Sequence, residues 1–339
     1  MKAVILVGGE ATRLLPLTCN IPKAIIPVLN TPFLEHVIRY LSQHQIRDII
    51  LTQGRLSIES YFGDGSQFGV RLSYTMEDNP LGTAGAVKNA EKYLDGTFLV
   101  LNGDVFTDLD ITAMISFHLA RKAKATIALT AVDDPTSYGL VETDTESRIT
   151  CFLEKPSWNQ VTTNMINAGV YVLEPDVLAQ IPPQANFSFE HELFPLLLDR
   201  GEPVYAYPSP AYWIDMGTPE KYLQLHRDLL SGKSSQYALT SGEEVLIGEQ
   251  SYIHPKAQIK GPVVIGSGCT ILEGAVIEQS VIWHKVKIGR GATVRNSIVA
   301  NHCCLNNNSL IEESVLGDNV TVSSGGKLEP GSKIWPELR

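Results

Sequence analysis

The sequence predicts an α/β fold with a mainly parallel, doubly wound sheet, followed by a separate β-solenoid. Residues 1 to about 230 alternate between apolar runs and segments with apolar residues at helical spacing. This alternation is typical of a parallel sheet with helices on both faces. After about residue 245, aliphatic residues recur every six positions, a period that suits neither a helix nor an ordinary sheet. We therefore expect a domain at residues 1–230, a linker at 231–244 and a second domain at 245–335.

Apolar runs in the first domain predict strands at residues 3–7, 48–52, 98–101, 126–132 and 149–153. Helices are predicted to begin near residues 31, 110 and 218, and the last one to end near residue 230. At Thr31 and Thr218 a capping hydroxyl precedes a proline, which is favoured in the first turn of a helix. Because ligands of such sheets bind beyond the carboxyl ends of the strands, the loops after the strands are expected to carry function.

The second domain shows a six-residue repeat with one slip. In a β-solenoid each short strand is one side of a coil, and the repeated aliphatic side chains stack into a single core. The period shortens to five residues once, before residue 282, and then resumes. The repeated positions are Ile247, Ile253, Ile259, Ile265, Ile271, Ile277, Ile282, Ile288 and Val294. The repeat resembles that of hexapeptide-repeat proteins, which implies a left-handed β-helix.

Composition limits the classes of partner. The formal net charge is −10, which disfavours coating of nucleic acid or of an anionic membrane surface. The first apolar run is too short for a signal peptide, and none approaches the length of a membrane span. The five cysteines are odd in number and show no metal-ligand spacing. We expect a cytoplasmic protein that binds neither nucleic acid nor a membrane.

The loop after the first strand has the residues of a phosphate-binding loop. Gly8 and Gly9 allow backbone N–H groups to approach a polyphosphate. Arg13 and Lys23 can add charge-assisted hydrogen bonds to the same oxygens. The spacing matches neither the P-loop nor the dinucleotide-binding motif, so any phosphate site here is of another kind.

The run from residue 6 to residue 23 resembles the signature G-G-x-G-T-R-L-x-P-L-T, followed by P-K, of the nucleotidyltransferase family of sugar-nucleotide pyrophosphorylases. The chain departs from it at Ala11, where the family usually has glycine. Six further segments resemble family motifs in the family's order. They lie at residues 77–85, 102–104, 138–139, 154–156, 167–171 and 213–219.

The resemblance implies an enzyme that joins a sugar 1-phosphate to a nucleoside triphosphate (NTP) and releases pyrophosphate, with Mg²⁺. It implies three groups of binding residues and one catalytic set. Nucleotide-binding residues are Gly8, Gly9, Thr12, Arg13, Lys23, Glu77, Gly82 and Thr83. Sugar-phosphate residues are Tyr138, Gly139, Glu154, Lys155, Asn167 and Trp213. Asp104 and Asp215 are metal ligands. The catalytic set is Arg13, Lys23, Asp104, Lys155 and Asp215.

The two aspartates also suit a metal by position. Asp104 follows four apolar residues at the end of a predicted strand, and Asp215 precedes a glycine and a helix start. Two carboxylates from separate strand ends can hold one Mg²⁺ together with phosphate oxygens and water. A turn or helix-capping role is the alternative for each aspartate.

Glu77 bears on the choice of nucleotide. It stands where thymidylyl- and uridylyltransferases of the family often have glutamine, which can both donate to and accept from uracil or thymine. An ionised carboxylate only accepts, and guanine offers adjacent N1–H and N2–H₂ donors. Glu77 therefore favours GTP, unless it points to solvent and Asp78 or the backbone reads the base. The whole chain most resembles mannose-1-phosphate guanylyltransferases, which implies GDP-mannose as product; glucose 1-phosphate with UTP or dTTP is the alternative.

Two other functional classes remain open on the sequence. A non-catalytic regulatory paralogue would use the β-helix to dock a partner, although the predicted catalytic residues are all present. An added acyltransferase activity would use His284 or His302, but neither lies in a recognisable acyl-carrier motif. Because exposed coil edges and apolar faces need covering, we expect the β-helix to form a homo-oligomer.

Overall fold

The computed structural model describes residues 1–9, 11–54, 58–235 and 244–336. The chain divides into two compact units. The sheet unit comprises Met1–Gly9 and Val37–Trp213, and the β-helix unit comprises Glu10–His36 and Ile214–Arg339. The predicted phosphate-binding loop after Gly9 thus groups with the β-helix. Most of the predicted linker at 231–244 falls on residues 236–243, which lie outside the described residues.

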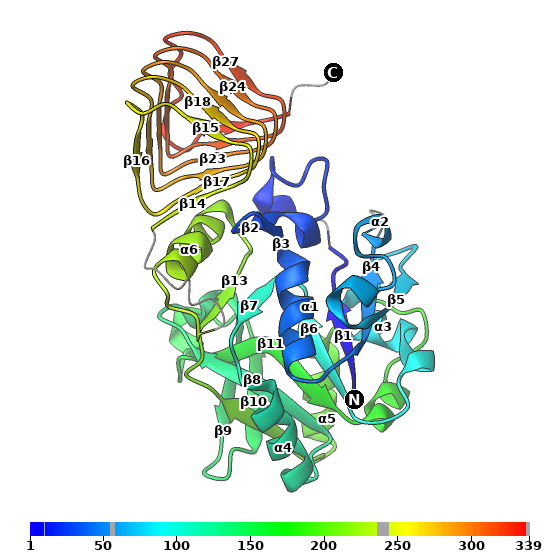
Figure 1. The fold of residues 1–339 in the computed structure, drawn as a ribbon. Coiled ribbons are helices and arrows are strands. Elements are labelled where there is room, and N and C mark those ends of the chain that lie inside the picture. The colour runs from blue at the N-terminus through cyan, green and yellow to red at the C-terminus, as the bar shows by residue number, and fades with distance from the viewer. Residues whose placement is uncertain (10, 55–57, 236–243, 337–339) are drawn as a thin grey trace. The chain divides into compact units, whose positions relative to one another are not determined.

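The sheet unit contains a nine-stranded mixed sheet (Figure 1). Its strands are β1 (Lys2–Leu6), β4 (Asp48–Gln53), β5 (Arg71–Met76), β6 (Phe98–Asn102), β8 (Ala125–Ala131), β9 (Gly139–Thr143), β10 (Ile149–Glu154), β11 (Met165–Leu173) and β12 (Val204–Pro208). The main path runs β10-β9-β11-β6-β1-β4-β5, and β8 joins β11 to β12. Strands β5, β4, β1 and β6 are mutually parallel. Strand β11 runs antiparallel to both β6 and β8. The five predicted strands are confirmed to within two residues.

Helices cover both faces of this sheet, as a doubly wound fold requires. They are α2 (Glu59–Phe62), α3 (Gly82–Asn89), α4 (Ile111–Arg121) and α5 (Phe194–Asp199). Ile127 of β8 joins one core with Val87 of α3 and Phe194 of α5. The next residue back, Thr126, points to the opposite face, where its hydroxyl lies 2.8 Å from Nδ1 of His118 on α4.

The β-helix unit contains three sheets of parallel strands (Figure 1). The first consists of β14 (Val245–Ile247), β17 (Val263–Ile265), β20 (Val281–Ile282), β23 (Ile298–Val299), β26 (Val315–Leu316) and β28 (Lys333–Ile334). The second consists of β15 (Tyr252–Ile253), β18 (Thr270–Ile271), β21 (Lys287–Ile288), β24 (Cys304–Leu305) and β27 (Thr321–Val322). The third consists of β16 (Gln258–Lys260), β19 (Val276–Glu278), β22 (Thr293–Arg295) and β25 (Leu310–Glu312). This arrangement is consistent with the left-handed β-helix that the repeat implies. The repeated positions from residue 265 to residue 294 are fully buried, whereas Ile247 on the terminal strand β14 is 47% exposed.

A tight corner explains the slip in the six-residue period. Gln279 and Asn296 adopt left-handed φ values of 48° and 46° there, which shortens the turn. The backbone N–H of Ser297 donates to the hydroxyl of Ser280, 17 residues earlier, at 3.1 Å. Ser314 donates to the hydroxyl of Ser297 in the same way at 3.0 Å. Successive coils therefore stack through a column of buried serines.

The β-helix unit also contains the elements of the loop and the last helix of the chain. They are β2 (Pro27–Val28), β3 (Thr31–Pro32) and α6 (Pro219–Leu230), with 3₁₀ turns at Thr12–Leu14 and Lys23–Ile25. Thr218 caps α6 as predicted, since its side chain accepts the N–H of Lys221. Helix α1 (Phe33–Gln43) begins after Pro32, because residues 31–32 pair with β2. The remaining strands of the described residues are β7 (Val105–Thr107) and β13 (Trp213–Asp215). Among the described residues, no helix combines the length and apolar character needed to cross a membrane.

His226 on α6 is a buried histidine with a defined tautomer. The backbone N–H of Leu29 donates to its Nε2 at 3.2 Å, so Nε2 carries no proton. Its Nδ1 therefore carries the proton and donates to the carbonyl of Tyr222 at 2.9 Å. Burial, with a smaller contribution from the nearby His36, lowers the pKa of His226 to about 4. The neutral ring joins α6 to the loop.

We predict that acid weakens this junction. The folded-state pKa of His226 lies below its ordinary value of 6.5, so its stabilisation is present above pH 6.5 and is lost as the pH falls towards 4. Between these limits the native chain should lose about 3 kcal/mol more free energy of unfolding than a His226→Gln variant. Glutamine keeps one acceptor and one donor but does not titrate. Urea unfolding as a function of pH measures the difference, and equal losses in the two proteins contradict the assignment.

Candidate active site

Glu77 points at the loop that follows β1. It comes directly after β5, and its side chain is half-buried. A Cβ placed on Gly8 would lie 3.2 Å from Oε1 of Glu77, so the carboxylate packs against the glycine. Its Oε2 accepts the backbone N–H of Leu81 at 3.1 Å. Burial raises the pKa of the Glu77 carboxyl. The carboxylate thus lies between the two segments predicted to bind the nucleotide.

The next residues of this segment, Gly82 and Thr83, pack against residues 187–190. Gly82 begins α3 with a φ of 70°, and a Cβ there would meet the Phe187 carbonyl at 2.7 Å. The hydroxyl of Thr83 donates to Oε2 of Glu190 at 2.9 Å and accepts the N–H of Phe189 at 2.9 Å. The Thr83 hydroxyl is therefore engaged by Phe189 and Glu190, and these contacts hold the loop in place.

Five of the predicted sugar-phosphate residues form a second cluster. Tyr138 and Trp213 pack edge to face with ring centroids 5.5 Å apart. The carbonyl of Tyr138 accepts the N–H of Lys155 at 2.9 Å, and Lys155 Nζ lies 3.8 Å from Oε1 of Glu154. A Cβ on Gly139 would come within 2.8 Å of Oε2 of Glu154. Only glycine leaves room for that carboxylate.

Asn167 lies in a chain of hydrogen bonds that ends at Glu190. Its Nδ2 donates to the hydroxyl of Tyr171 at 2.8 Å, and that hydroxyl donates to Oε1 of Glu190 at 3.1 Å. Its Oδ1 accepts the N–H of Gly169 at 2.9 Å. The indole N–H of Trp213 donates to the Ala168 carbonyl of the same strand at 2.8 Å. The amide of Asn167 is therefore fixed in orientation.

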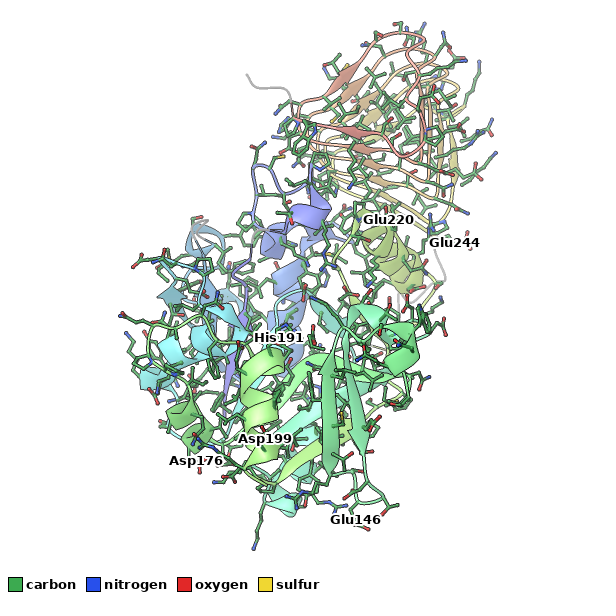
Figure 2. The ribbon with its side chains drawn as sticks, turned by 180° about the vertical axis from the view of Figure 1, so that it is seen from behind. Glu146, Asp176, His191, Asp199, Glu220 and Glu244 are labelled. Carbon is green, nitrogen blue, oxygen red and sulfur yellow. The ribbon has the colours of Figure 1, made fainter. Side chains whose placement is uncertain are left out.

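Glu190 is a residue that the sequence analysis missed. It lies in a π-helical turn, Phe189–Leu193, which leads into α5; Figure 2 labels His191 in this turn and Asp199 at the far end of the helix. Its carboxylate accepts from Thr83, Tyr171 and Ser188, the last at 2.7 Å. It therefore joins the nucleotide segment to the sugar segment. The π-helical turn, a feature often found at functional sites, had no evident sequence signal.

Glu154 carries a buried oxygen that lacks a partner. Among the described residues, no group donates to its Oε2. Burial raises the pKa of the Glu154 carboxyl most, and the neighbouring Glu190 raises it further, against Lys155 and His191. An unpaired buried acceptor costs about 1–3 kcal/mol. The oxygen is therefore suited to a donor from a ligand, such as a sugar hydroxyl.

Asp104 lies at the carboxyl end of β6, where the sequence placed it. The preceding Gly103 donates its N–H to the carbonyl of Leu6 in β1 at 2.9 Å. This bond ties the turn that carries Asp104 to the strand that leads into Gly8. Within the sheet unit, the phosphate-loop glycines and one predicted metal ligand thus share one edge of the sheet.

The remaining predicted residues belong to the β-helix unit. Ala11, where the family usually has glycine, adopts a left-handed φ of 46°, at a cost of roughly 1–2 kcal/mol for a residue with a Cβ. Thr12 and Arg13 follow in a 3₁₀ turn. A Cβ on Gly217 would lie 3.2 Å from Nη2 of Arg13 and 2.8 Å from Oδ2 of Asp215. Arg13 and Asp215 therefore flank this glycine.

Asp215 has a cationic neighbour that the sequence analysis also missed. Lys221, in the first turn of α6, forms an ion pair with its Oδ1. The Asp215 side chain is 12% exposed, so this lysine offsets a nearly buried charge. Lys23 opens the 3₁₀ turn Lys23–Ile25 of the same unit. No group of three or more metal-ligating side chains occurs in the described part of the chain. One or two carboxylates are what Mg²⁺ commonly takes from a protein when phosphates supply the rest, and each of the two aspartates offers a donor of this type.

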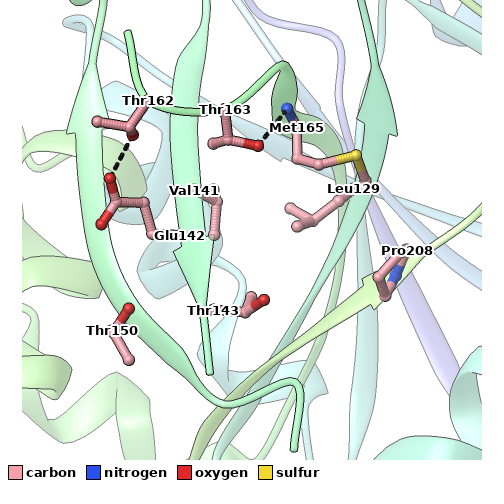
Figure 3. Close-up of a pocket in the computed structure, with 9 residues that line it drawn as sticks. All are labelled: Leu129, Val141, Glu142, Thr143, Thr150, Thr162, Thr163, Met165 and Pro208. Atoms are coloured by element: carbon pink, nitrogen blue, oxygen red, sulfur yellow. Dashed lines mark hydrogen bonds between the residues drawn. The ribbon is translucent and has the colours of Figure 1, made fainter. Parts of the chain in front are cut away.

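A separate pocket of about 340 Å³ opens beside strands β9 and β10 (Figure 3). Its lining is rich in threonine, and Thr162 there donates to Glu142. The lining residues are Leu129, Val141, Glu142, Thr143, Thr150, Thr162, Thr163, Met165 and Pro208. None of the predicted site residues is among them, so this pocket is distinct from the clusters described above.

Two family models account for nearly the whole chain. A model described as nucleotidyl transferase matches residues 2–232, and one described as the GMPPB C-terminal domain matches residues 241–336.

Individual relatives agree on the class of reaction but differ in substrates. The mannose-1-phosphate guanylyltransferase of Mycobacterium tuberculosis is 38% identical over 299 residues, which are 87% of this chain and 83% of that protein. The UTP--glucose-1-phosphate uridylyltransferase of Synechocystis sp. is 34% identical over an alignment 343 residues long, which covers 90% of this chain and 88% of that protein. Among solved structures, HddC from Yersinia pseudotuberculosis complexed with GMP-PN has a TM-score of 0.56 and 31% identity. The likeness covers 66% of this chain and 97% of that one.

We predict that Glu190→Gln loosens both segments that this carboxylate joins. Glutamine keeps only one oxygen for three donors, so at least one buried hydroxyl loses its acceptor. The free energy of unfolding should fall by about 1–3 kcal/mol. A matched Glu146→Gln variant changes an exposed carboxylate (Figure 2) and should stay within about 0.5 kcal/mol of the native chain. Urea unfolding compares the variants, and equal effects would show that Glu190 joins nothing.

Proposed function

The chain belongs to the nucleotidyl transferase family, and we propose that it forms GDP-mannose from GTP and mannose 1-phosphate, with release of pyrophosphate. The carboxylate of Glu77, held against Gly8 by burial and by the Leu81 N–H, is the observation that carries the choice of guanine. The mycobacterial relative is named a mannose-1-phosphate guanylyltransferase. The Yersinia relative was crystallised with GMP-PN.

Glu77 supports a guanine ring by its bonding capacity. A carboxylate is an acceptor at both oxygens, and the N1–H and N2–H₂ of guanine are two adjacent donors on one edge. A charged acceptor pair makes such hydrogen bonds about twice as strong as neutral ones. Uracil and thymine present one N–H between two carbonyl oxygens, which a carboxylate would repel. The residue therefore discriminates by attraction to one base and repulsion of the others.

The transfer needs alignment and charge neutralisation more than a covalent intermediate. An oxygen of the sugar phosphate attacks the α-phosphorus of GTP, the bond from that phosphorus to the bridging oxygen breaks, and pyrophosphate leaves. We assign Arg13 and Lys23 to the triphosphate, chiefly to the departing pyrophosphate, because fixed cations stabilise charge there without reorganisation. Magnesium, when bound, would be held by Asp104 and Asp215 and would neutralise phosphate charge.

The sugar phosphate is assigned to the second cluster of the sheet unit. Lys155 takes its phosphate, because its exposed ammonium stands beside the Glu154 carboxylate. Glu154 offers its unpaired buried oxygen to a sugar hydroxyl. Asn167 keeps one amide hydrogen beyond the bond to Tyr171. Tyr138, Gly139 and Trp213 shape the surface against which the sugar lies.

A second candidate is transfer of a uridylyl group to glucose 1-phosphate. The Synechocystis relative, which covers most of this chain, is named for that reaction. Both candidates use the same phosphate chemistry and differ in the base and the sugar. Glu77 is the predicted site residue whose bonding capacity separates the two bases.

The β-helix is assigned a role in assembly as well. Its first coils expose Ile247 and Tyr252, and its last coil exposes Trp335 at 57%. Such apolar side chains at the ends of a solenoid favour contact between copies of the chain. A homo-oligomer follows, and a monomeric mass by light scattering at micromolar concentration contradicts it.

A pyrophosphate-release assay across five triphosphates and several sugar 1-phosphates tests the proposal. GTP with mannose 1-phosphate should give the highest kcat/KM. Glu77→Gln should lower kcat/KM for GTP and raise it for UTP. Because burial raises the pKa of Glu77, the KM for GTP should increase as the pH falls towards the acid range, and the glutamine variant should lack this increase. A native preference for UTP or dTTP contradicts the role given to Glu77.

Lys23→Ala should remove a cation that is needed in the transition state. A loss on the order of a hundredfold in kcat/KM is expected, as for other fixed donors to a developing charge. Lys256→Ala serves as the control, since this exposed lysine pairs with Glu273 on the β-helix surface. Near-native kcat/KM in the Lys23 variant would remove that residue from the mechanism.

A further inference from the structure

The loop that carries Arg13 and Lys23 is held by the C-terminal half of its own unit. Residues 10–36 share that unit with α6 and the β-helix. Asn30 donates its side-chain N–H to the carbonyl of Ile265 in β17 at 2.9 Å. A residue of the phosphate-binding loop is thus bonded directly to a coil of the β-helix.

A buried relay makes a second connection. The indole N–H of Trp283 donates to the hydroxyl of Tyr222 at 2.9 Å. That hydroxyl donates in turn to the carbonyl of Pro27 in the loop. Trp283 is 1% exposed and Tyr222 is fully buried, so the bond between them is shielded from water. The tyrosine hydroxyl accepts from the β-helix and donates to the loop, and each bond strengthens the other.

The backbone between Lys23 and the Pro27 carbonyl is short and contains hydrogen bonds. Lys23 lies four residues before Pro27 and opens a 3₁₀ turn. The N–H of Ile26 donates to the carbonyl of Lys23 at 3.2 Å. Strand β2, which contains Pro27, pairs with β3. A shift of Pro27 therefore displaces the turn that carries Lys23.

We infer that Trp283 and Tyr222 are positioning residues: through the Pro27 carbonyl they hold the loop with Arg13 and Lys23 where it meets the triphosphate. The β-helix is then a working part of the phosphate site in addition to an assembly module. The inference rests on the proposed function for its kinetic readout. Helix α6 contacts two parts of the proposed site. Lys221 in its first turn pairs with Asp215, and the next residue, Tyr222, anchors the loop.

Trp283→Phe in the full-length chain tests this directly. The variant keeps an aromatic ring in the buried site but lacks the indole N–H. The KM for GTP should rise about fivefold or more, the scale of a lost buried hydrogen bond, while the KM for mannose 1-phosphate stays within about twofold. Tyr222→Phe should do the same, and the double variant should add little to either single one, because both remove the same relay.

Ile311→Ala is the matched control. Ile311 is fully buried in β25 of another sheet of the β-helix, so its truncation destabilises the coil without removing a bond to the loop. It should leave both KM values within about twofold of the native enzyme. The inference is overturned if Trp283→Phe leaves the KM for GTP within twofold, or if Ile311→Ala raises that KM as much.

Hydrogen–deuterium exchange gives a readout that needs no turnover. Backbone amides of residues 23–36 should exchange faster in Trp283→Phe than in the native chain or in Ile311→Ala. Unchanged exchange in that segment overturns the anchor. If the native chain turns over no pair of substrates, the proposed function fails, and exchange alone still decides whether the relay holds the loop.

Discussion

The hydrogen bond from the Tyr222 hydroxyl to the Pro27 carbonyl is the contact on which the proposed phosphate site depends. With a net charge of −10, the chain offers no general positive field to a triphosphate, so a few fixed cations must supply the attraction. Arg13 and Lys23 sit on a loop made of two 3₁₀ turns and a two-residue β pair. Because these elements are short, the loop relies on contacts with the rest of its unit.

The support comes from the C-terminal part of the chain, which has a repeated sequence. A solenoid is rigid because every coil is bonded to its neighbours along three sheets, and here a column of serines adds bonds at one corner. Trp283 lies in this scaffold and reaches Tyr222. The repeat thereby supports a loop that is built only from short turns and a short β pair. Glu190 serves the sheet unit in the same manner, since one carboxylate binds Thr83 and Tyr171.

Local patterns in the sequence predicted the elements well, and distant contacts escaped them. The six-residue period predicted the β-helix, and the cap at Thr218 predicted the start of α6, because both depend only on neighbouring residues. Glu190 lies 107 residues from Thr83, and Trp283 lies 61 residues from Tyr222. No spacing rule connects such pairs. Ala11 is another feature that local sequence does not predict. Its left-handed φ is unfavourable for a residue with a Cβ, and it follows from the path of the loop.

A crystal structure of the chain with GTP and Mg²⁺ tests the central claim most directly, namely that an anchored loop supplies the cations for the triphosphate while Glu77 reads the base. The account predicts side-chain nitrogens of Arg13 and Lys23 within hydrogen-bond distance of phosphate oxygens. It also predicts both oxygens of Glu77 on the N1–H and N2–H₂ edge of guanine. A triphosphate that touches neither cation, or a guanine ring turned away from Glu77, would contradict it.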